Sequence, residues 1–302
     1  MGHIFEAISR ADQGQAPTSR PQGNTLPPAA ARPAHDADRP ELAVAADQDA
    51  SWPNSLVFSA AIGQTDPKVV DDRLLVLREP VSVPAEEYRA IRTGILARWQ
   101  NKRHLIHTIT SATPQEGKTI TSLNLGLSFA ELRTRRTLVI EADLRLPQFK
   151  SLLKLPESPG LVGLLNGEAP LAAVVQAVGE NHLHVIQAGK CSGVQPVQLL
   201  SSPMMTDLLA TLRRQYDHVI IDTPPVVELA DAGILGAQSD DVLLIARMQM
   251  TPRSLIDQAM RTLASYNAPV AGMIATDQPA DHGRYAKYSY KYRYRYQRRA
   301  AA

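Results

Sequence analysis

The sequence predicts an α/β fold in which a mostly parallel, doubly wound sheet carries helices on both of its faces. Short and nearly continuous apolar runs, such as 218–221 and 242–245, are typical of strands that are buried on both sides. Between such runs lie longer segments, such as 118–131, in which apolar residues recur at helical spacing. This alternation indicates parallel strands joined by right-handed helical crossovers.

The regular pattern extends over about residues 81–277, which we interpret as one folded domain. The helix predicted over 118–131 places Ile120, Leu123 and Leu127 near one face, and we expect that face to pack on the sheet. The predicted strands are 105–110, 137–140, 184–186, 218–221, 242–245 and 270–274, and further helices are predicted at 203–215 and 252–266.

The N-terminal segment 1–80 differs from this domain in composition. It holds nine of the 22 prolines of the chain, and we expect 12–80 to be mostly disordered because such a segment buries little apolar surface. Within 3–11, Ile4, Phe5 and Ile8 fall on one helical face. This short amphipathic start is either a frayed turn or a small docking helix for a partner.

The C-terminal segment 278–302 is basic and rich in tyrosine. Between Asp281 and Ala302 it has seven Lys or Arg and one Asp, hence a net charge of +6, and we expect a mobile tail. Interleaved tyrosine and arginine can also bind nucleic acid or anionic lipid, which we consider the less favoured interpretation. The six tail tyrosines are Tyr285, Tyr288, Tyr290, Tyr292, Tyr294 and Tyr296.

The overall composition excludes several classes of protein. The 302 residues include 32 basic and 30 acidic side chains, and a net charge of +2 excludes a chain whose whole surface binds a polyanion. The single cysteine, Cys191, excludes a disulfide scaffold and a multi-cysteine zinc site. Neither a long uncharged apolar stretch nor a secretory signal is evident, so we expect a cytosolic chain.

A phosphate-binding loop is the strongest motif. The run A-T-P-Q-E-G-K-T at 112–119 follows a predicted strand and opens a predicted helix, which is the context that a P-loop requires. We expect the loop amides and Lys118 to hold the phosphates of ATP, and the Thr119 hydroxyl to bind Mg²⁺. The candidate nucleotide-binding residues are Pro114, Gln115, Glu116, Gly117, Lys118, Thr119, Ile120 and Arg145.

Three carboxylates follow predicted strands and complete the candidate site. Glu141 and Asp143 come at the end of one strand and Asp222 at the end of another, and ligands of parallel α/β sheets bind beyond these ends. Side chains alternate along a strand, so we expect Glu141 and Asp143 to face the same way. The pattern indicates a P-loop NTPase with Thr119, Glu141 and Asp222 as metal ligands. We take Glu141 as the candidate base, supported by Asp143, and count Lys118 and Asp222 with them as catalytic residues. Arg145 pairs with a phosphate or with an acid.

The motifs resemble those of the bacterial tyrosine kinases of capsule and exopolysaccharide synthesis. The resemblance covers about 80–302 and rests on S-A-T-P-Q-E-G-K-T at 111–119, L-V-I-E-A-D-L-R-L-P at 138–147 and V-I-I-D-T-P-P-V at 219–226. The tyrosine-rich tail and Asp231 with Ala232 also match. The resemblance implies that the γ-phosphoryl group of ATP is transferred to tail tyrosines of a neighbouring subunit.

The resemblance also implies partners and a location. Glu86, Arg89 and Arg92 match the family's E-x-x-R-x-x-R motif, which implies a ring-like homo-oligomer, and on a helix the three residues share one side. A separate transmembrane activator of the polysaccharide copolymerase type, a cognate tyrosine phosphatase and a position at the inner face of the plasma membrane are further implied.

The sequence departs from the family pattern at four positions. Ala112 and Gln115 stand where glycines are usual in the loop, Glu141 replaces an aspartate, and Thr276 replaces an asparagine that often reads adenine. Two other functions stay open at this point. One is a positioning ATPase of the ParA/MinD kind, although Thr113 stands where those proteins have a signature lysine. The other is a nucleotide-binding adaptor of a polysaccharide machine without catalysis.

Overall fold

The computed structural model describes residues 66, 68–179, 183–193 and 195–277. The amphipathic start expected at 3–11 and the mobile tail expected at 278–302 lie outside the described residues. Of the segment 12–80, expected to be mostly disordered, the structure describes only 66 and 68–80. The six tail tyrosines also lie outside the described residues.

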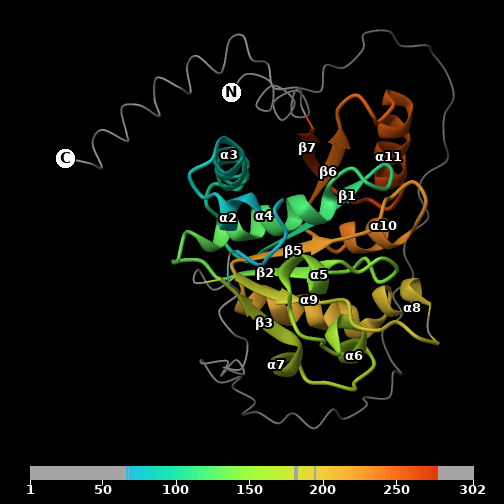
Figure 1. The fold of residues 1–302 in the computed structure, drawn as a ribbon. Coiled ribbons are helices and arrows are strands. Elements are labelled where there is room, and N and C mark those ends of the chain that lie inside the picture. Colours follow the sequence, from blue (N-terminus) through green and yellow to red (C-terminus); the bar gives the residue numbers. More distant parts are fainter. Residues whose placement is uncertain (1–65, 67, 180–182, 194, 278–302) are drawn as a thin grey trace, which may run out of the picture.

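One sheet of seven strands forms the centre of the described part of the molecule, in the order β3-β4-β2-β5-β1-β6-β7 (Figure 1). Six strands run parallel, and β3 pairs antiparallel with β4 at one edge. The mostly parallel sheet is therefore confirmed. The strands are β1 Leu105–Ser111, β2 Thr137–Glu141, β3 Val175–Val178, β4 Leu183–Ile186, β5 His218–Asp222, β6 Asp241–Arg247 and β7 Val270–Thr276.

The edge strand β3 was not predicted. It has four residues and directly follows α7, Leu171–Val174, so it offers neither a long apolar run nor a turn signal to mark its start. Its pairing with β4 nevertheless buries Val175 and Val178 and covers that edge of the sheet.

Helices cover both faces of the sheet, as the sequence predicts. Side chains alternate along β2, so that Val139 faces one core while Leu138 and Ile140 face the other. The first core lies under α2 Leu75–Arg78, α3 Val83–Arg98 and α4 Lys118–Ala130 (Figure 1). The second face is covered chiefly by α9 Pro203–Gln215, α10 Asp231–Gly236 and α11 Arg253–Ser265. The shorter helices are α5 Phe149–Leu153, α6 Gly160–Leu165 and α8 Pro196–Leu200.

The folded part begins earlier than the expected boundary at residue 80. Val70, Leu74 and Val76 are buried in the first core. The backbone N–H of Val76 donates to Asn124 Oδ1 in α4 at 3.0 Å. The segment 68–80 therefore belongs to the domain, because its apolar residues are buried against α4 and its backbone is hydrogen-bonded there.

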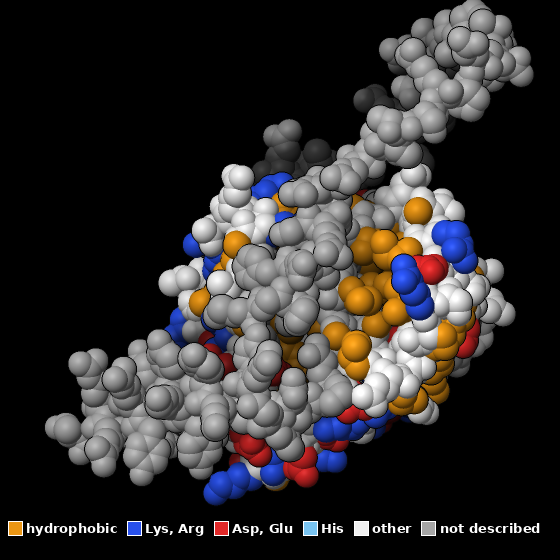
Figure 2. Space-filling view, turned by 90° about the horizontal axis from the view of Figure 1, so that it is seen from above, with side chains coloured by type: hydrophobic (Ala, Val, Ile, Leu, Met, Phe, Trp, Pro, Cys, Tyr) orange, Lys and Arg blue, Asp and Glu red, His pale blue; other side chains and the backbone are white. Residues whose placement is uncertain are grey.

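The surface of the described part mixes apolar and charged side chains. Figure 2 shows hydrophobic side chains gathered on one face, beside basic and acidic ones. The exposed large hydrophobic residues include Met204, Met248, Met250 and Met260. Among the described helices, none has the length and apolar character that crossing a membrane requires.

Candidate active site

The phosphate-binding loop lies between the carboxyl end of β1 and the first turn of α4. Lys118 is the first residue of the helix, and Gly117 before it has a φ of 92°. This left-handed conformation is readily available only to glycine. The loop therefore ends where the free N–H groups of a 13-residue helix point outward, an arrangement suited to binding phosphate.

Glu116 braces the loop from inside. Its side chain is buried, and its carboxylate accepts hydrogen bonds from the N–H of Ala112 at 3.1 Å and the Thr113 hydroxyl at 2.8 Å. The Thr251 hydroxyl, from the segment after β6, also donates to it. The side chain of Glu116 thus shapes the loop.

The tip of the loop is exposed and conformationally unusual. Pro114 and Gln115 are exposed, and Gln115 has a φ of 62°, in the region that favours glycine. This geometry explains why a glycine is usual at this position. The base of the loop packs on β7, where the Thr276 hydroxyl donates to the carbonyl oxygen of Glu116 at 2.8 Å. Ile120 packs against the core under α4.

Lys118 and Asp222 form the buried centre of the site. Burial lowers the pKa of Lys118, and the charges of Asp222 and Asp143 oppose this shift. Burial raises the pKa of Asp222 to about 7, which the hydroxyl of Thr119 and the charge of Lys118 counteract. Asp222 Oδ1 also accepts a hydrogen bond from Ser122 Oγ at 3.0 Å. The sequence motifs predicted every one of these residues except Ser122.

Glu141, the residue expected as base and metal ligand, is buried among backbone N–H donors. It is 2% exposed, and its Oε1 accepts from the backbone N–H of Phe149 at 2.7 Å and of Gln148. Its Oε2 accepts from the N–H of Ala188 at 2.9 Å. Burial raises the pKa of Glu141, and these three donors oppose the shift. Both oxygens are engaged by the protein's own backbone.

Asp143 follows the end of β2, which stops at Glu141. Asp143 is half-buried, and its Oδ1 accepts from the N–H groups of Arg145 at 3.3 Å and Leu146 at 3.1 Å. Its charge acts on Lys118, so it lies beside the phosphate loop. Arg145 pairs with an acid, since its Nε lies 3.4 Å from Asp231 Oδ2.

The site fits a magnesium ion held by few protein ligands. In the described ranges, no group of three or more His, Cys, Asp or Glu residues is arranged to hold a metal. Thr119 and Asp222 supply a hydroxyl and a carboxylate next to each other, and Mg²⁺ prefers such oxygen ligands while it retains several waters.

The arginines of the E-x-x-R-x-x-R segment lie on one side of α3 and contact α4. Arg89 binds the carboxylate of Glu131 through Nε at 2.8 Å and through a terminal nitrogen at 2.6 Å, and it also pairs with Glu86. Arg92 contacts Glu131 and the carbonyl oxygen of Ser128. The expected oligomerisation residues are thus brought together, with Glu131 as a partner that the motif did not indicate.

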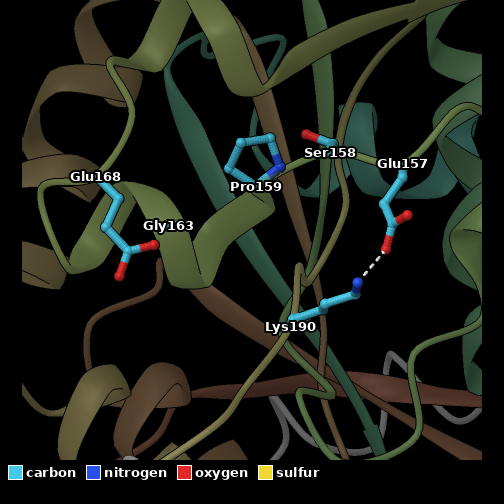
Figure 3. A pocket seen from close by; sticks show the side chains of 6 residues that line it. All are labelled: Glu157, Ser158, Pro159, Gly163, Glu168 and Lys190. Carbon is cyan, nitrogen blue, oxygen red and sulfur yellow. Dashed lines mark ion pairs between the residues drawn. The ribbon is translucent and has the colours of Figure 1, made fainter.

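A cavity of about 330 Å³ opens beyond the carboxyl end of β4 (Figure 3). Its wall includes Glu157, which pairs with Lys190 at 2.8 Å. None of the predicted site residues lines it; the lining residues are Glu157, Ser158, Pro159, Gly163, Glu168 and Lys190. The phosphate site is therefore distinct from this cavity.

The loop, the helix that it opens and the carboxylates at neighbouring strand ends define a P-loop NTPase. Residues 115–267 match the AAA domain family. The structure resembles the kinase domain of Escherichia coli tyrosine kinase ETK, with a TM-score of 0.64 and 28% identity, over 70% of this chain and 83% of that one. It is also similar to the chimerical protein CapA2B2, with a TM-score of 0.64 and 26% identity, over 69% of this chain and 91% of that one.

Sequence comparison defines the family more narrowly. The chain is 34% identical to the tyrosine-protein kinase YwqD of Bacillus subtilis over 71% of its own length and 90% of that protein. It is 31% identical to the tyrosine-protein kinase etk of Escherichia coli over 66% of its own length, but spans only 27% of that longer protein. The chain belongs to the bacterial tyrosine kinases.

Proposed function

We propose that the chain is an ATP-dependent protein-tyrosine kinase that phosphorylates tail tyrosines of a neighbouring subunit. The observation that carries this proposal is the meeting of Lys118, Asp222 and Asp143 beside the loop that opens α4. The chain also contains its own candidate acceptors, the six tyrosines between Tyr285 and Tyr296. Membership in the bacterial tyrosine kinases supports the same activity.

The residues of the loop and its helix bind and orient the phosphates. Phosphoryl transfer depends chiefly on positioning and on stabilising negative charge. The free N–H groups at the start of α4 and the ammonium group of Lys118 contact the phosphate oxygens. Thr119 and Asp222 would hold Mg²⁺, which would neutralise charge on the phosphates. Burial of Lys118 and Asp222 excludes water and strengthens these interactions.

Asp143 is the group that accepts the tyrosine proton. A tyrosine hydroxyl has a pKa near 10 and is a poor nucleophile at neutral pH without a nearby base. The tyrosine oxygen forms a bond to the γ-phosphorus while the bond from phosphorus to the bridging oxygen of ADP breaks, and the hydroxyl proton moves to Asp143. We assign this role to Asp143 because Glu141 has both oxygens engaged by backbone N–H groups.

The biological setting is proposed by family resemblance. The kinase regulates polymerisation and export of an exopolysaccharide or capsule, as a ring-like oligomer that uses Glu86, Arg89 and Arg92. A transmembrane protein activates it at the inner face of the plasma membrane, and a tyrosine phosphatase reverses the modification. Each phosphotyrosine adds about −1.5 to −2 charges, so phosphorylation reverses the +6 charge of the tail and loosens the ring.

The test is to incubate the full chain with Mg-ATP and to map phosphotyrosine by mass spectrometry. Lys118→Met removes the phosphate-binding ammonium group, and Lys190→Met removes an exposed lysine outside the site as a matched control. We expect phosphate on Tyr285–Tyr296 in the wild-type chain and in Lys190→Met, and none in Lys118→Met. The assay is repeated with the cytosolic segment of a candidate membrane activator.

ATP binding without any phosphotyrosine, with and without the activator segment, would contradict the kinase and favour a nucleotide-binding adaptor. Mixing Lys118→Met chains with wild-type chains tests transfer between subunits. Phosphotyrosine on the inactive chain is expected, whereas its absence there would show transfer within one chain.

A further inference from the structure

Asp231 is a buried carboxylate that lacks its expected hydrogen-bond donors. It begins α10 and is 1% exposed, and within the described residues neither Oδ1 nor Oδ2 has a hydrogen-bond partner of ordinary geometry. Buried polar side chains in folded proteins are almost always hydrogen-bonded. A carboxylate in this position therefore requires an explanation.

Its one ion-pair partner in the described part of the chain is Arg145, at 3.4 Å between Nε and Oδ2. A guanidinium group has five N–H donors in a fixed plane. The contact is made by Nε, and at 3.4 Å it is longer than an ordinary charged hydrogen bond. The two terminal nitrogens of Arg145 are available to another acceptor, and the side chain is 35% exposed.

The backbone around Arg145 is held by the carboxylates that precede it. Asp143 accepts hydrogen bonds from the N–H groups of Arg145 and Leu146, and Glu141 accepts that of Phe149. The start of the Arg145 side chain is thus anchored by the turn, and its far end is directed by Asp231. The same Asp143 acts on the charge of Lys118, so the turn lies next to the phosphate loop.

We propose that Asp231 is a positioning residue, which holds Arg145 by its Nε edge so that the two terminal nitrogens meet the phosphoryl group in transfer. This inference rests on the proposed kinase function. A planar guanidinium is suited to two oxygens of one phosphoryl group, and a carboxylate behind it fixes the plane. When the terminal nitrogens of Arg145 bind the phosphoryl group, its Nε–H moves closer to Asp231 and supplies the hydrogen bond that the carboxylate lacks.

The surrounding charges support this arrangement. Burial raises the pKa of Asp231, and Asp143 adds to the shift. The charge of Arg145 and its contact with the carboxylate oppose the shift, as does the backbone N–H of Asp231 itself. Pairing with Arg145 is the contact that makes a negative Asp231 favourable in this place.

The test measures a transition-state mimic as well as catalysis. We compare Asp231→Asn, Arg145→Ala and the double variant for binding of Mg-ADP, alone and with tetrafluoroaluminate, and for kcat and KM of autophosphorylation. Asp240→Asn is the matched control, because Asp240 also pairs with an arginine, Arg213, at 2.6 Å, but precedes β6 at the other end of the strands. Thermal unfolding is recorded for every variant.

We expect Asp231→Asn to weaken binding of the tetrafluoroaluminate complex and to lower kcat by about 10-fold to 100-fold. Binding of Mg-ADP and the KM for ATP should change less than about twofold. In the Arg145→Ala background, Asp231→Asn should have no further effect, since a positioning residue acts only through its partner. Asp240→Asn should leave binding and kcat unchanged.

Three results would overturn the inference. Asp231→Asn could bind the mimic as the wild-type chain does, or its effect could be as large without Arg145 as with it. Asp231→Asn could also keep its fold but lose binding of Mg-ADP and of the mimic equally. If Asp231→Asn does not fold, Arg145→Lys, which keeps the charge but lacks Nε, must show the same selective loss. The binding readout does not need kinase activity, so an inactive wild-type chain would refute the proposed function without deciding the role of Asp231.

Discussion

Glu141 Oε2 accepts a hydrogen bond from the backbone N–H of Ala188 at 2.9 Å, which fastens the end of β2 to the segment after β4. Oε1 of the same carboxylate accepts the N–H of Phe149, where α5 begins. One buried side chain therefore joins three segments beside the phosphate loop. Asp143, two residues later, is half-buried and lies next to Lys118.

Because Glu141 binds backbone N–H groups and Asp143 lies beside Lys118, we predict that amide substitution affects stability at Glu141 and the rate of transfer at Asp143. Glu141→Gln turns an NH₂ group toward backbone N–H donors, so the free energy of unfolding should fall by about 2 kcal/mol. Asp143→Asn should change it by less than about 0.5 kcal/mol but lower the rate of transfer by about 100-fold, because it removes the carboxylate proposed as the base. Urea denaturation and the rate of phosphotyrosine formation measure the two effects. Unchanged stability with lost transfer in Glu141→Gln would return the role of base to Glu141.

Gln115 occupies a left-handed conformation at the tip of the phosphate loop, with a φ of 62°. Gln115→Gly should not destabilise the protein and should raise the free energy of unfolding by up to about 1 kcal/mol, because glycine adopts this φ without strain. Gln115→Val should lower it by about 1–2 kcal/mol, since a β-branched residue fits this region poorly.

Gln148→Val is the matched control for the loop variants. Gln148 is also exposed, but its φ of −127° lies outside the left-handed region, so we expect valine to cost less here than at Gln115, about 0.5 kcal/mol. Equal effects of valine at the two positions would show that the backbone of Gln115 is not strained.

Glu131, which follows α4, pairs with Arg89 and Arg92 of the E-x-x-R-x-x-R segment and so links α3 to α4. Glu131→Gln should lower the free energy of unfolding by about 1–2 kcal/mol, because its carboxylate makes two short hydrogen bonds to Arg89 in a partly buried position. Glu86→Gln removes the exposed partner of the same arginine and should cost less than about 0.5 kcal/mol. Faster hydrogen exchange in α3 is expected for the first variant alone, and equal protection in both would contradict the assignment.

Parts of the fold and site could be predicted because their causes are local in the sequence. The buried strands are continuous apolar runs, and the phosphate loop is a contiguous motif, so Lys118, Thr119 and Asp222 were expected where they lie. The hydrogen bonds of Asp143 could not be predicted from strand alternation, because Asp143 lies after the end of β2, where it accepts from the N–H groups of Arg145 and Leu146.

Other contacts depend on residues that only the tertiary structure brings together. Arg89 meets Glu131 across 42 residues, and Glu141 meets the N–H of Ala188 across 47. No spacing in the sequence indicates either pair. The sequence identified Asp231 only as part of a family motif. That its carboxylate is buried without hydrogen-bond donors depends on how α10 packs on the sheet.

His218 predicts a loss of stability in weak acid. Burial, followed by the charges of His107 and Arg135, lowers its pKa from 6.5 to about 2. The terminal nitrogen of Arg135 lies 3.0 Å from His218 Nε2, and an arginine can only donate, so this ring nitrogen must accept and the imidazole is neutral. Protonation would remove that acceptor and place a buried positive charge beside a guanidinium.

The unfolded chain binds a proton at His218 below pH 6.5, whereas the folded chain does so only near pH 2. The contribution of His218 to stability is therefore complete above pH 6.5 and is lost progressively as the pH falls below it. Between pH 7.5 and pH 5 the loss should be about 2 kcal/mol. Urea denaturation at both values should show this loss in the wild-type chain, and a loss smaller by that amount in His218→Gln. The same pH dependence in His218→Gln would show that other groups cause it.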